Sequence, residues 1–206
     1  MSREIHDIFD VILKIIAVIY GTIFLNYIGI EGEVEEILNI EFTTLAGSKL
    51  YLDFLCRMKN NTLRHIEFQY PRAGPEHSPR FFRYNIVAEA RYLTITETTV
   101  FNFTQGLGNE KTQAMGESKS FHPHHFNLGD VDFEKYMENI NMKVKSNTKL
   151  THFEEITLQL MALNYDFKDK RTILKNVSKL IENRELFDES KFEFVQAVVE
   201  RNQQSA

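Results

Sequence analysis

Residues 51–70 read YLDFLCRMKNNTLRHIEFQY, and this stretch decides the fold that we expect. On both sides of the Asn60-Asn61 pair, apolar residues recur at every second position, which is typical of half-buried strands. Asparagine is a common turn residue, so the pattern predicts an antiparallel hairpin with strands over about residues 50–58 and 63–70. Each strand carries one carboxylate in its middle, Asp53 and Glu67.

A turn centred on Asn60 pairs Asp53 with Glu67, directly or one diagonal step away. Directly opposite residues have Cβ atoms about 4.5–5.5 Å apart, and two carboxylates at that distance repel unless one is protonated or a cation lies between them. Oxygen ligands of this kind suit Mg²⁺ or Mn²⁺. Because side chains alternate along a strand, Gln69 projects from the same face as Glu67.

An exposed strand face is the alternative explanation, because solvent-facing strand residues are often charged. By spacing alone we favour this explanation for the carboxylate pair. His65 shares the predicted face of Glu67, where we favour a half-exposed strand histidine over a general base. In either case alternation buries the opposite face, which carries Leu52, Phe54, Ile66 and Phe68.

The composition is that of a globular protein of one domain, or of one domain with an appendage. Of the 206 residues, 43% are hydrophobic and 26% are charged, and the net charge of −5 gives no global attraction to nucleic acid. Any contact with DNA therefore has to be local. The single cysteine, Cys56, excludes a disulfide framework and fits a reducing cytoplasm, and we expect a buried structural thiol.

Outside the hairpin, the pattern predicts an αβ core over residues 1–130 and a helical C-terminal extension over 131–206, packed on that core. We expect an N-terminal helix to about Tyr27 with a break at Gly21 or Gly29, and a capping box at Thr151 and Glu154. Further predicted elements are a strand over 37–45, an exposed loop over 71–79, a helix within 81–93, a strand over 93–103 and helices from 132 onward.

The apolar segment 11–30 is the one stretch that resembles a membrane anchor. Lys14 and Asn26 interrupt it, and the clean apolar run is shorter than the roughly 20 residues that cross a bilayer. We therefore expect a core helix without stable membrane insertion.

Several motifs in order resemble the PD-(D/E)XK nuclease superfamily, and in particular its transposase-like, recombination-promoting nuclease branch. Asp53 is followed by a hairpin and by HIEFQ (65–69), whose Glu-x-Gln replaces the usual Glu-x-Lys. RFFRY (80–84) resembles the Arg-x-x-x-Tyr that opens the following helix of the family. HDIFDVILK (6–14) and LTHFEE (150–155) resemble its first helix and a later helical element, although the family usually has a basic residue at position 10.

The resemblance, over about residues 4–165, implies an α/β (α+β) fold with a mixed central sheet flanked by helices and a restriction-endonuclease-like core. It also implies cleavage of DNA phosphodiester bonds with Mg²⁺ or Mn²⁺, in the cytoplasm, by a homodimer if both strands are cut. By position, Asp53, Glu67 and the Phe68 carbonyl bind the metal, and Asp53, Glu67 and Gln69 form the catalytic set. Arg80, Arg83 and Tyr84 are then the residues that contact the substrate.

Glutamine can only hydrogen-bond where lysine would also supply positive charge. The alternative to an active endonuclease is therefore a catalytically degenerate nuclease fold that binds DNA or a protein partner.

Two other groups of residues are weaker candidates. His122, His124 and His125 have the composition of a zinc or nickel site, but we favour a surface loop because no cysteine or carboxylate pair completes a ligand set. The lysines and arginine between 168 and 179 are more typical of a solvated helix face than of a DNA contact.

Overall fold

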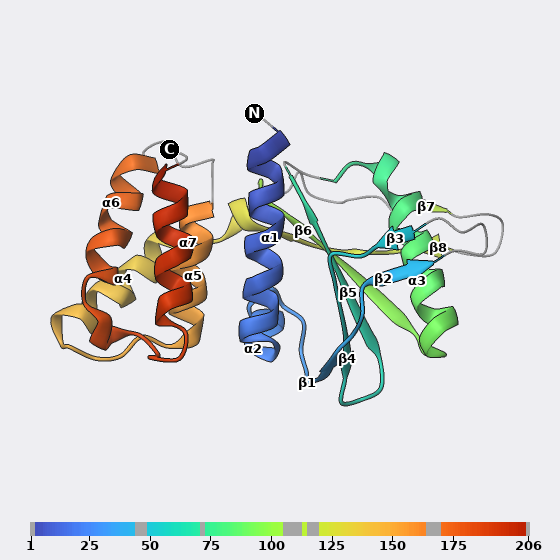
Figure 1. Ribbon diagram of the computed structural model, residues 1–206, viewed down its shortest axis with the longest axis horizontal. Coiled ribbons are helices and arrows are strands. Elements are labelled where there is room, and N and C mark those ends of the chain that lie inside the picture. The colour runs from blue at the N-terminus through green and yellow to red at the C-terminus, as the bar shows by residue number, and fades with distance from the viewer. Residues whose placement is uncertain are drawn as a thin grey trace. The chain divides into compact units, whose positions relative to one another are not determined.

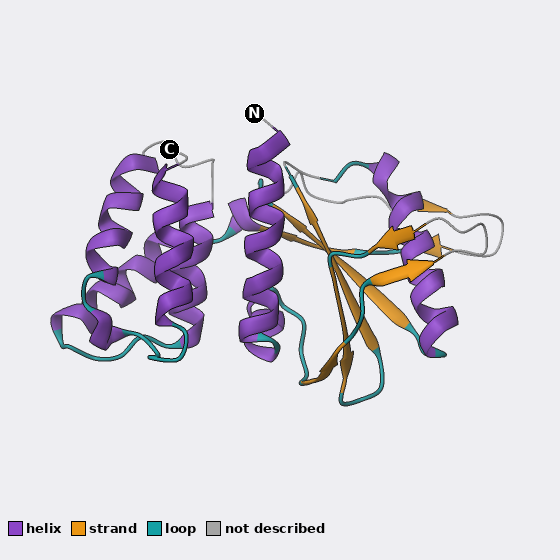
Figure 2. Ribbon diagram, in the orientation of Figure 1, coloured by secondary structure: helices purple, strands orange, loops and turns teal. Residues whose placement is uncertain are grey.

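The computed structural model of the chain describes residues 3–43, 49–70, 73–104, 113–114, 120–163 and 170–204. The chain forms two compact units (Figure 1). We call Ile28–Leu128 the sheet unit, and Met1–Tyr27 together with Gly129–Ala206 the helical unit. In Figure 2 every strand belongs to the sheet unit, and the helical unit contains helices and loops.

The centre of the sheet unit is a mixed sheet of five strands. Its spatial order is β1 (Val34–Ile37), β4 (Phe54–Met58), β5 (Leu63–Gln69), β6 (Thr96–Asn102) and β9 (His124–Asn127). The first three strands pair antiparallel, while β6 is parallel to both β5 and β9. Parallel neighbours need a crossover connection, and α3 (Ser78–Tyr92) supplies it between β5 and β6.

One face of this sheet packs against α3 and a second hairpin, β2 (Glu41–Thr43) with β3 (Lys49–Tyr51), as Figure 1 shows. Leu55 and Leu63 from the sheet meet Ala88 of α3 in a shared apolar cluster. We call this the α3 face. The neighbouring positions along the strands, such as Phe54 and Ile66, are buried on the opposite face.

Shorter elements complete the sheet unit. They are η1 (Pro75–His77), the paired strands β7 (Gln113–Ala114) and β8 (Ser120–Phe121), and η2 (Leu128–Asp130), along which the chain passes from the sheet unit to the helical unit.

The helical unit surrounds one central helix. Its elements are α1 (Arg3–Tyr20), α2 (Thr22–Tyr27), α4 (Phe133–Lys145), α5 (His152–Leu163), α6 (Lys170–Ile181), η3 (Arg184–Leu186) and α7 (Phe192–Gln204). Helix α5 is in contact with all the other α-helices of the unit. Its residues from Glu154 to Leu163 are all buried, as expected for a helix that is enclosed by others.

Most local predictions are confirmed. The N-terminal helix breaks at Gly21, whose φ of +46° favours glycine. Thr151 and Glu154 form the predicted capping box, with the Thr151 N–H donating to Glu154 Oε2 at 2.6 Å. The predicted mixed α/β fold with a central sheet is also observed. No helix within the described residues has the length and apolar character needed to span a bilayer.

Three local predictions differ from the structure. The exposed loop predicted over 71–79 contains η1 and the first residues of α3. The histidine-rich segment predicted as a surface loop forms β9 over His124–Asn127, because parallel pairing with β6 satisfies its backbone groups. The strand predicted over 37–45 is not continuous, because β1 ends at Ile37 and β2 over Glu41–Thr43 is a separate strand.

The division into units also differs from the boundaries predicted at residue 130. Residues 1–27, which we expected within the αβ core, group with the C-terminal helices. Tyr20 of α1 lies in the side-chain hydrogen-bond network of Glu155 and Gln159 on α5, which joins the two ends of the chain.

Candidate active site on the hairpin

The β4–β5 hairpin has the predicted register. Phe54 pairs with Ile66 and Leu55 with His65, so Asp53, one residue before β4, falls opposite Glu67. The Met58 N–H donates to the Thr62 carbonyl at 2.9 Å and closes a three-residue turn. Within that turn Asn61 has a φ of 64°, a left-handed conformation that asparagine tolerates.

The two carboxylates are tied to the opposite strand. The backbone N–H of Phe68 donates to Asp53 Oδ2 at 2.9 Å, and the backbone N–H of Asp53 donates to Glu67 Oε1 at 3.4 Å. Each carboxylate therefore accepts a hydrogen bond from the strand that carries the other, which fixes both at one end of the hairpin.

Glu67 is buried, with 2% of its surface exposed, so the alternative of an exposed strand face is wrong for this residue. Its Oε1 lies 2.9 Å from His65 Nε2, and its Oε2 lies 3.5 Å from Arg80 Nη2. A buried carboxylate is stable only with such partners, since an unpaired charge is strongly disfavoured in the interior.

His65 is fully buried, and the predicted half-exposed histidine is therefore also wrong. Its Nδ1 lies 3.1 Å from Thr98 Oγ1 and 3.3 Å from Asn85 Oδ1. An ionised carboxylate has only acceptors, so Nε2 donates to Glu67 when Glu67 is charged. The His65 ring thus contacts residues of β6 and α3 through Nδ1 and contacts Glu67 through Nε2.

Asn85 and Thr98 are neighbours of the candidate site that the sequence pattern did not single out. The Thr98 hydroxyl donates to Asn85 Oδ1 at 2.5 Å, and Asn85 Nδ2 donates to the Thr96 carbonyl at 3.1 Å. The sequence indicates only the side of a strand or helix on which each residue lies. It does not indicate their contact, because the two residues come from elements that are distant along the chain.

The first turns of α3 bring its Arg-x-x-x-Tyr motif to the acid pair. Arg80 is half-exposed beside Glu67, and its guanidinium lies 4.9 Å from the Phe81 ring centroid. Tyr84, one turn on, meets the His65 ring edge-on with centroids 5.9 Å apart. Burial raises the pKa of Tyr84, and the negative charges of Glu67 and Asp53 raise it further. Arg83 is exposed on the same helix.

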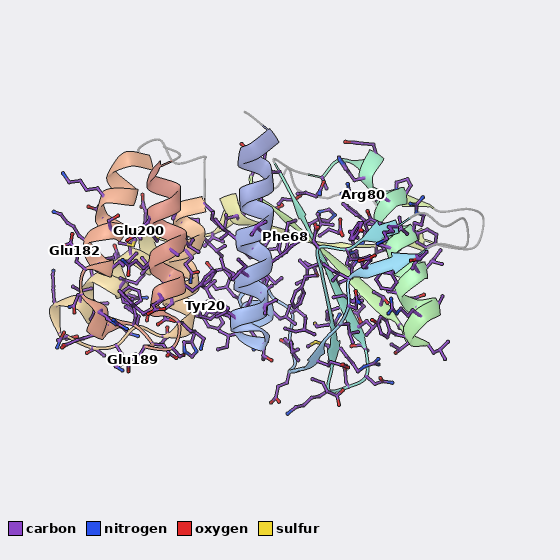
Figure 3. All side chains as sticks on the ribbon, viewed as in Figure 1. Tyr20, Phe68, Arg80, Glu182, Glu189 and Glu200 are labelled. Carbon is purple, nitrogen blue, oxygen red and sulfur yellow. The ribbon has the colours of Figure 1, made fainter. Side chains whose placement is uncertain are left out.

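The remaining predicted ligands lie beside the pair. The Gln69 side chain donates from Nε2 to the Phe68 carbonyl at 2.9 Å, the oxygen predicted to bind metal. Figure 3 labels Phe68 on its strand and Arg80 on its helix.

The donor set fits a hard cation. Asp53, Glu67 and the Phe68 carbonyl offer oxygen atoms, and Mg²⁺ in proteins commonly takes one or two carboxylates and keeps several waters. Within the described ranges, no three His, Cys, Asp or Glu side chains group closely enough to form a metal site by themselves. A site here would therefore depend on the backbone carbonyl and on water.

Cys56 and the basic residues of the C-terminal segment are the other residues considered in the sequence. Cys56 is buried as predicted, and burial raises the pKa of its thiol to about 12. Of the basic residues in the C-terminal segment, Lys168 lies outside the described residues, whereas Lys175 is exposed on α6.

No protein-family model matches the chain, and no curated protein or solved structure is significantly similar to it. The function of the chain therefore has to be inferred from the geometry of the site and from the motifs of the sequence.

Proposed function

We propose that the chain is a Mg²⁺- or Mn²⁺-dependent endodeoxyribonuclease of the PD-(D/E)XK type, of the transposase-like branch with Glu-x-Gln. The observation that carries this proposal is the pairing of Asp53 with Glu67 across the hairpin, beneath a helix that presents Arg80 and Tyr84. Two carboxylates held together, of which Glu67 is buried and Asp53 half-buried, with the Arg80 guanidinium on one side, are suited to hold a divalent cation near a phosphate.

The topology supports a restriction-endonuclease-like core within the sheet unit. An antiparallel hairpin bears the acidic residues, and α3 then crosses to the parallel strand β6. This arrangement is the mixed sheet that the motif resemblance implies, with the site at one end of the β4–β5 pair.

Each residue has a role in hydrolysis. A divalent cation bound here would lower the pKa of an attacking water and neutralise charge that develops on the phosphate. Asp53 and Glu67 would hold that cation together with the Phe68 carbonyl, once the Gln69 amide turns away from it. Gln69 would then orient the water. As the water oxygen bonds to phosphorus, the bond to the leaving sugar oxygen would break, and the proton that the water loses would pass through solvent to the leaving oxygen.

Arg80 supplies the positive charge that glutamine lacks. Its side chain is 42% exposed and lies next to Glu67, so it is accessible to a phosphate of DNA. His65 is a positioning residue, because it contacts Glu67 and not the reacting groups. A homodimer would supply the second site needed to cut both strands.

A second candidate function is a non-catalytic DNA- or protein-binding module that keeps the nuclease fold. The hydrogen bond from Gln69 to the Phe68 carbonyl favours it, since this bond occupies a predicted metal ligand.

Plasmid cleavage tests the proposal. Wild type with Mg²⁺ or Mn²⁺ should nick or linearise a plasmid, while Asp53→Ala and Glu67→Ala should lose on the order of a thousandfold in rate, because the cation contributes several kcal/mol. Asp130→Ala removes an exposed carboxylate elsewhere and should cleave as wild type does. Equal activity of all four proteins would disprove the assignment of the site.

Calorimetry with Mn²⁺ separates the two candidate functions. A nuclease should bind Mn²⁺ in a manner that depends on both Asp53 and Glu67. A wild-type protein that neither binds Mn²⁺ nor cleaves DNA would favour the binding module.

A further inference from the structure

The face of the sheet opposite α3 carries a pocket of about 430 Å³. The segment that precedes β1 contributes Ile28 and Ile30, and three adjacent strands contribute Arg64, Glu97, Thr99 and His124. These strands are β5, β6 and β9, which are neighbours in the five-stranded sheet. Arg64 alternates with His65 along β5, so the pocket and the hairpin site lie on opposite faces.

Arg64 is incompletely paired. Its Nη1 forms an ion pair with Glu97, and only 16% of its side chain is exposed. Its Nε is buried and has no hydrogen-bond partner in the described structure. An unsatisfied buried donor is unfavourable, so a ligand oxygen that reoriented the guanidinium and accepted from it would be stabilised.

Thr99 and His124 are also unpartnered. They are register neighbours on β6 and β9, so both side chains lie on the face that carries Arg64. Thr99 is 4% exposed, and the described chain provides no hydrogen bond or ion pair for its hydroxyl or for the His124 imidazole. Two further hydrogen-bonding side chains therefore meet at the wall of one pocket.

The unpartnered groups share one chemical property, which is that each can donate a hydrogen bond. Guanidinium, hydroxyl and imidazole donors together are suited to a group with several acceptor oxygens. The volume exceeds what a phosphate needs and lies within the range of small-molecule sites, and Ile28 and Ile30 give it an apolar wall. The described residues here do not form a group that could hold a metal ion.

We propose that this pocket binds a small phosphate-bearing molecule, with Arg64, Thr99 and His124 as donors to the phosphate and Glu97 as the internal anion that it displaces. The side chain of Glu97 is 42% exposed, so it can turn into solvent when a ligand takes its place on Arg64. Glu31 is a second carboxylate at the pocket, and it opposes anion binding. This inference does not depend on the nuclease proposal.

The displacement of Glu97 predicts the direction in which substitution of this residue should change phosphate affinity. Glu97→Gln removes the competing carboxylate and should bind phosphate about tenfold more tightly, because a like charge close to the ligand is lost. Glu35→Gln, on the exposed edge strand β1, changes the net charge equally and should leave affinity unchanged. A gain in affinity cannot result from misfolding, which keeps the test decisive even if Arg64→Gln fails to fold.

Titration calorimetry should use the intact chain with inorganic phosphate, with adenosine monophosphate, and with a single-stranded oligonucleotide that lacks terminal phosphates. We expect the two small ligands to bind at this site and the oligonucleotide not to bind there. Thr99→Val should weaken phosphate binding about tenfold because it loses one donor, and Thr99→Ser should restore it.

Three results would overturn the proposal. They are weaker or unchanged phosphate binding by Glu97→Gln, no effect of Thr99→Val, and binding of the oligonucleotide alone.

Discussion

Glu67 in the sheet unit and Glu155 in the helical unit are both buried, and the two residues differ in what surrounds the carboxylate. Glu155 on α5 is fully buried and accepts from the Tyr20 hydroxyl at 3.2 Å and from the Asp188 N–H at 2.7 Å. Glu67 is almost as buried, but its partners are the imidazole of His65, the guanidinium of Arg80 and the backbone of Asp53. Glu155 accepts from a hydroxyl and a backbone N–H, with His152 and Asp188 nearby, whereas Glu67 contacts an imidazole and a guanidinium directly.

The surroundings of Glu155 indicate a structural role. Gln159 donates from Nε2 to the Tyr20 hydroxyl at 3.0 Å, so the three side chains link α1 to α5. Figure 3 shows Tyr20 on its helix within this unit. Burial raises the pKa of Glu155, and burial together with the Glu155 charge raises the pKa of Tyr20. Burial of a carboxylate is therefore not sufficient to identify a site. At Glu67 the difference is that Asp53 lies opposite in the hairpin register and that Arg80 contacts the carboxylate directly.

The largest expected effect separates the two glutamates directly. Glu67→Gln and Glu155→Gln are nearly isosteric changes at buried positions. We expect Glu67→Gln to reduce plasmid cleavage on the order of a thousandfold, since it removes a charged ligand, and Glu155→Gln to retain wild-type cleavage. Thermal unfolding checks that both variants fold. Similar cleavage by the two folded variants would remove the distinction between the sites.

The next effect is a loss of stability that leaves the cleavage activity unchanged. Tyr20→Phe leaves Glu155 Oε2 and Gln159 Nε2 without the hydroxyl, so the free energy of unfolding should fall by about 1–3 kcal/mol. Urea unfolding measures this change, and plasmid cleavage should stay at the wild-type rate. Tyr51→Phe is the matched control at an exposed tyrosine, and it should change stability by less than about 0.5 kcal/mol.

A smaller effect is expected at Gln69, beside the first glutamate. Gln69→Lys adds the positive charge that the motif usually carries and should raise the cleavage rate about tenfold. Gln69→Met, which can neither donate nor carry charge, should lower the rate. Cleavage that is unaffected by either change would mean that position 69 does not act on the attacking water.

The smallest effect is the pH dependence of the second glutamate. Because its folded-state pKa is raised, Glu155 binds its proton more tightly in the folded protein than in the unfolded chain. Its contribution is fully present below the unfolded pKa of about 4.3 and is lost as the pH rises through the folded pKa. As the pH rises above about 4, the free energy of unfolding of Glu155→Gln should therefore increase relative to the free energy of unfolding of wild type. Urea titrations at several pH values measure the difference, and parallel curves would contradict it.

Much of the hairpin site could be predicted from local sequence pattern. Alternation indicated the strands, the Asn60-Asn61 turn indicated the register, and the two together paired Asp53 with Glu67. These features depend on residues that are neighbours in sequence, where side-chain parity and turn preference act directly. The break at Gly21 and the capping box at Thr151 were predictable for the same reason.

Only the tertiary structure decided the environment of those residues. The burial of His65 and Glu67 depends on Asn85 of α3 and Thr98 of β6. Local periodicity does not predict such contacts. Strand β9 forms because it pairs with the edge of β6. Helix α1 packs with the C-terminal helices through the hydrogen bonds of Tyr20. The sequence alone thus determined which residues face together on the hairpin. Long-range packing determined which of them are removed from water and what holds them there.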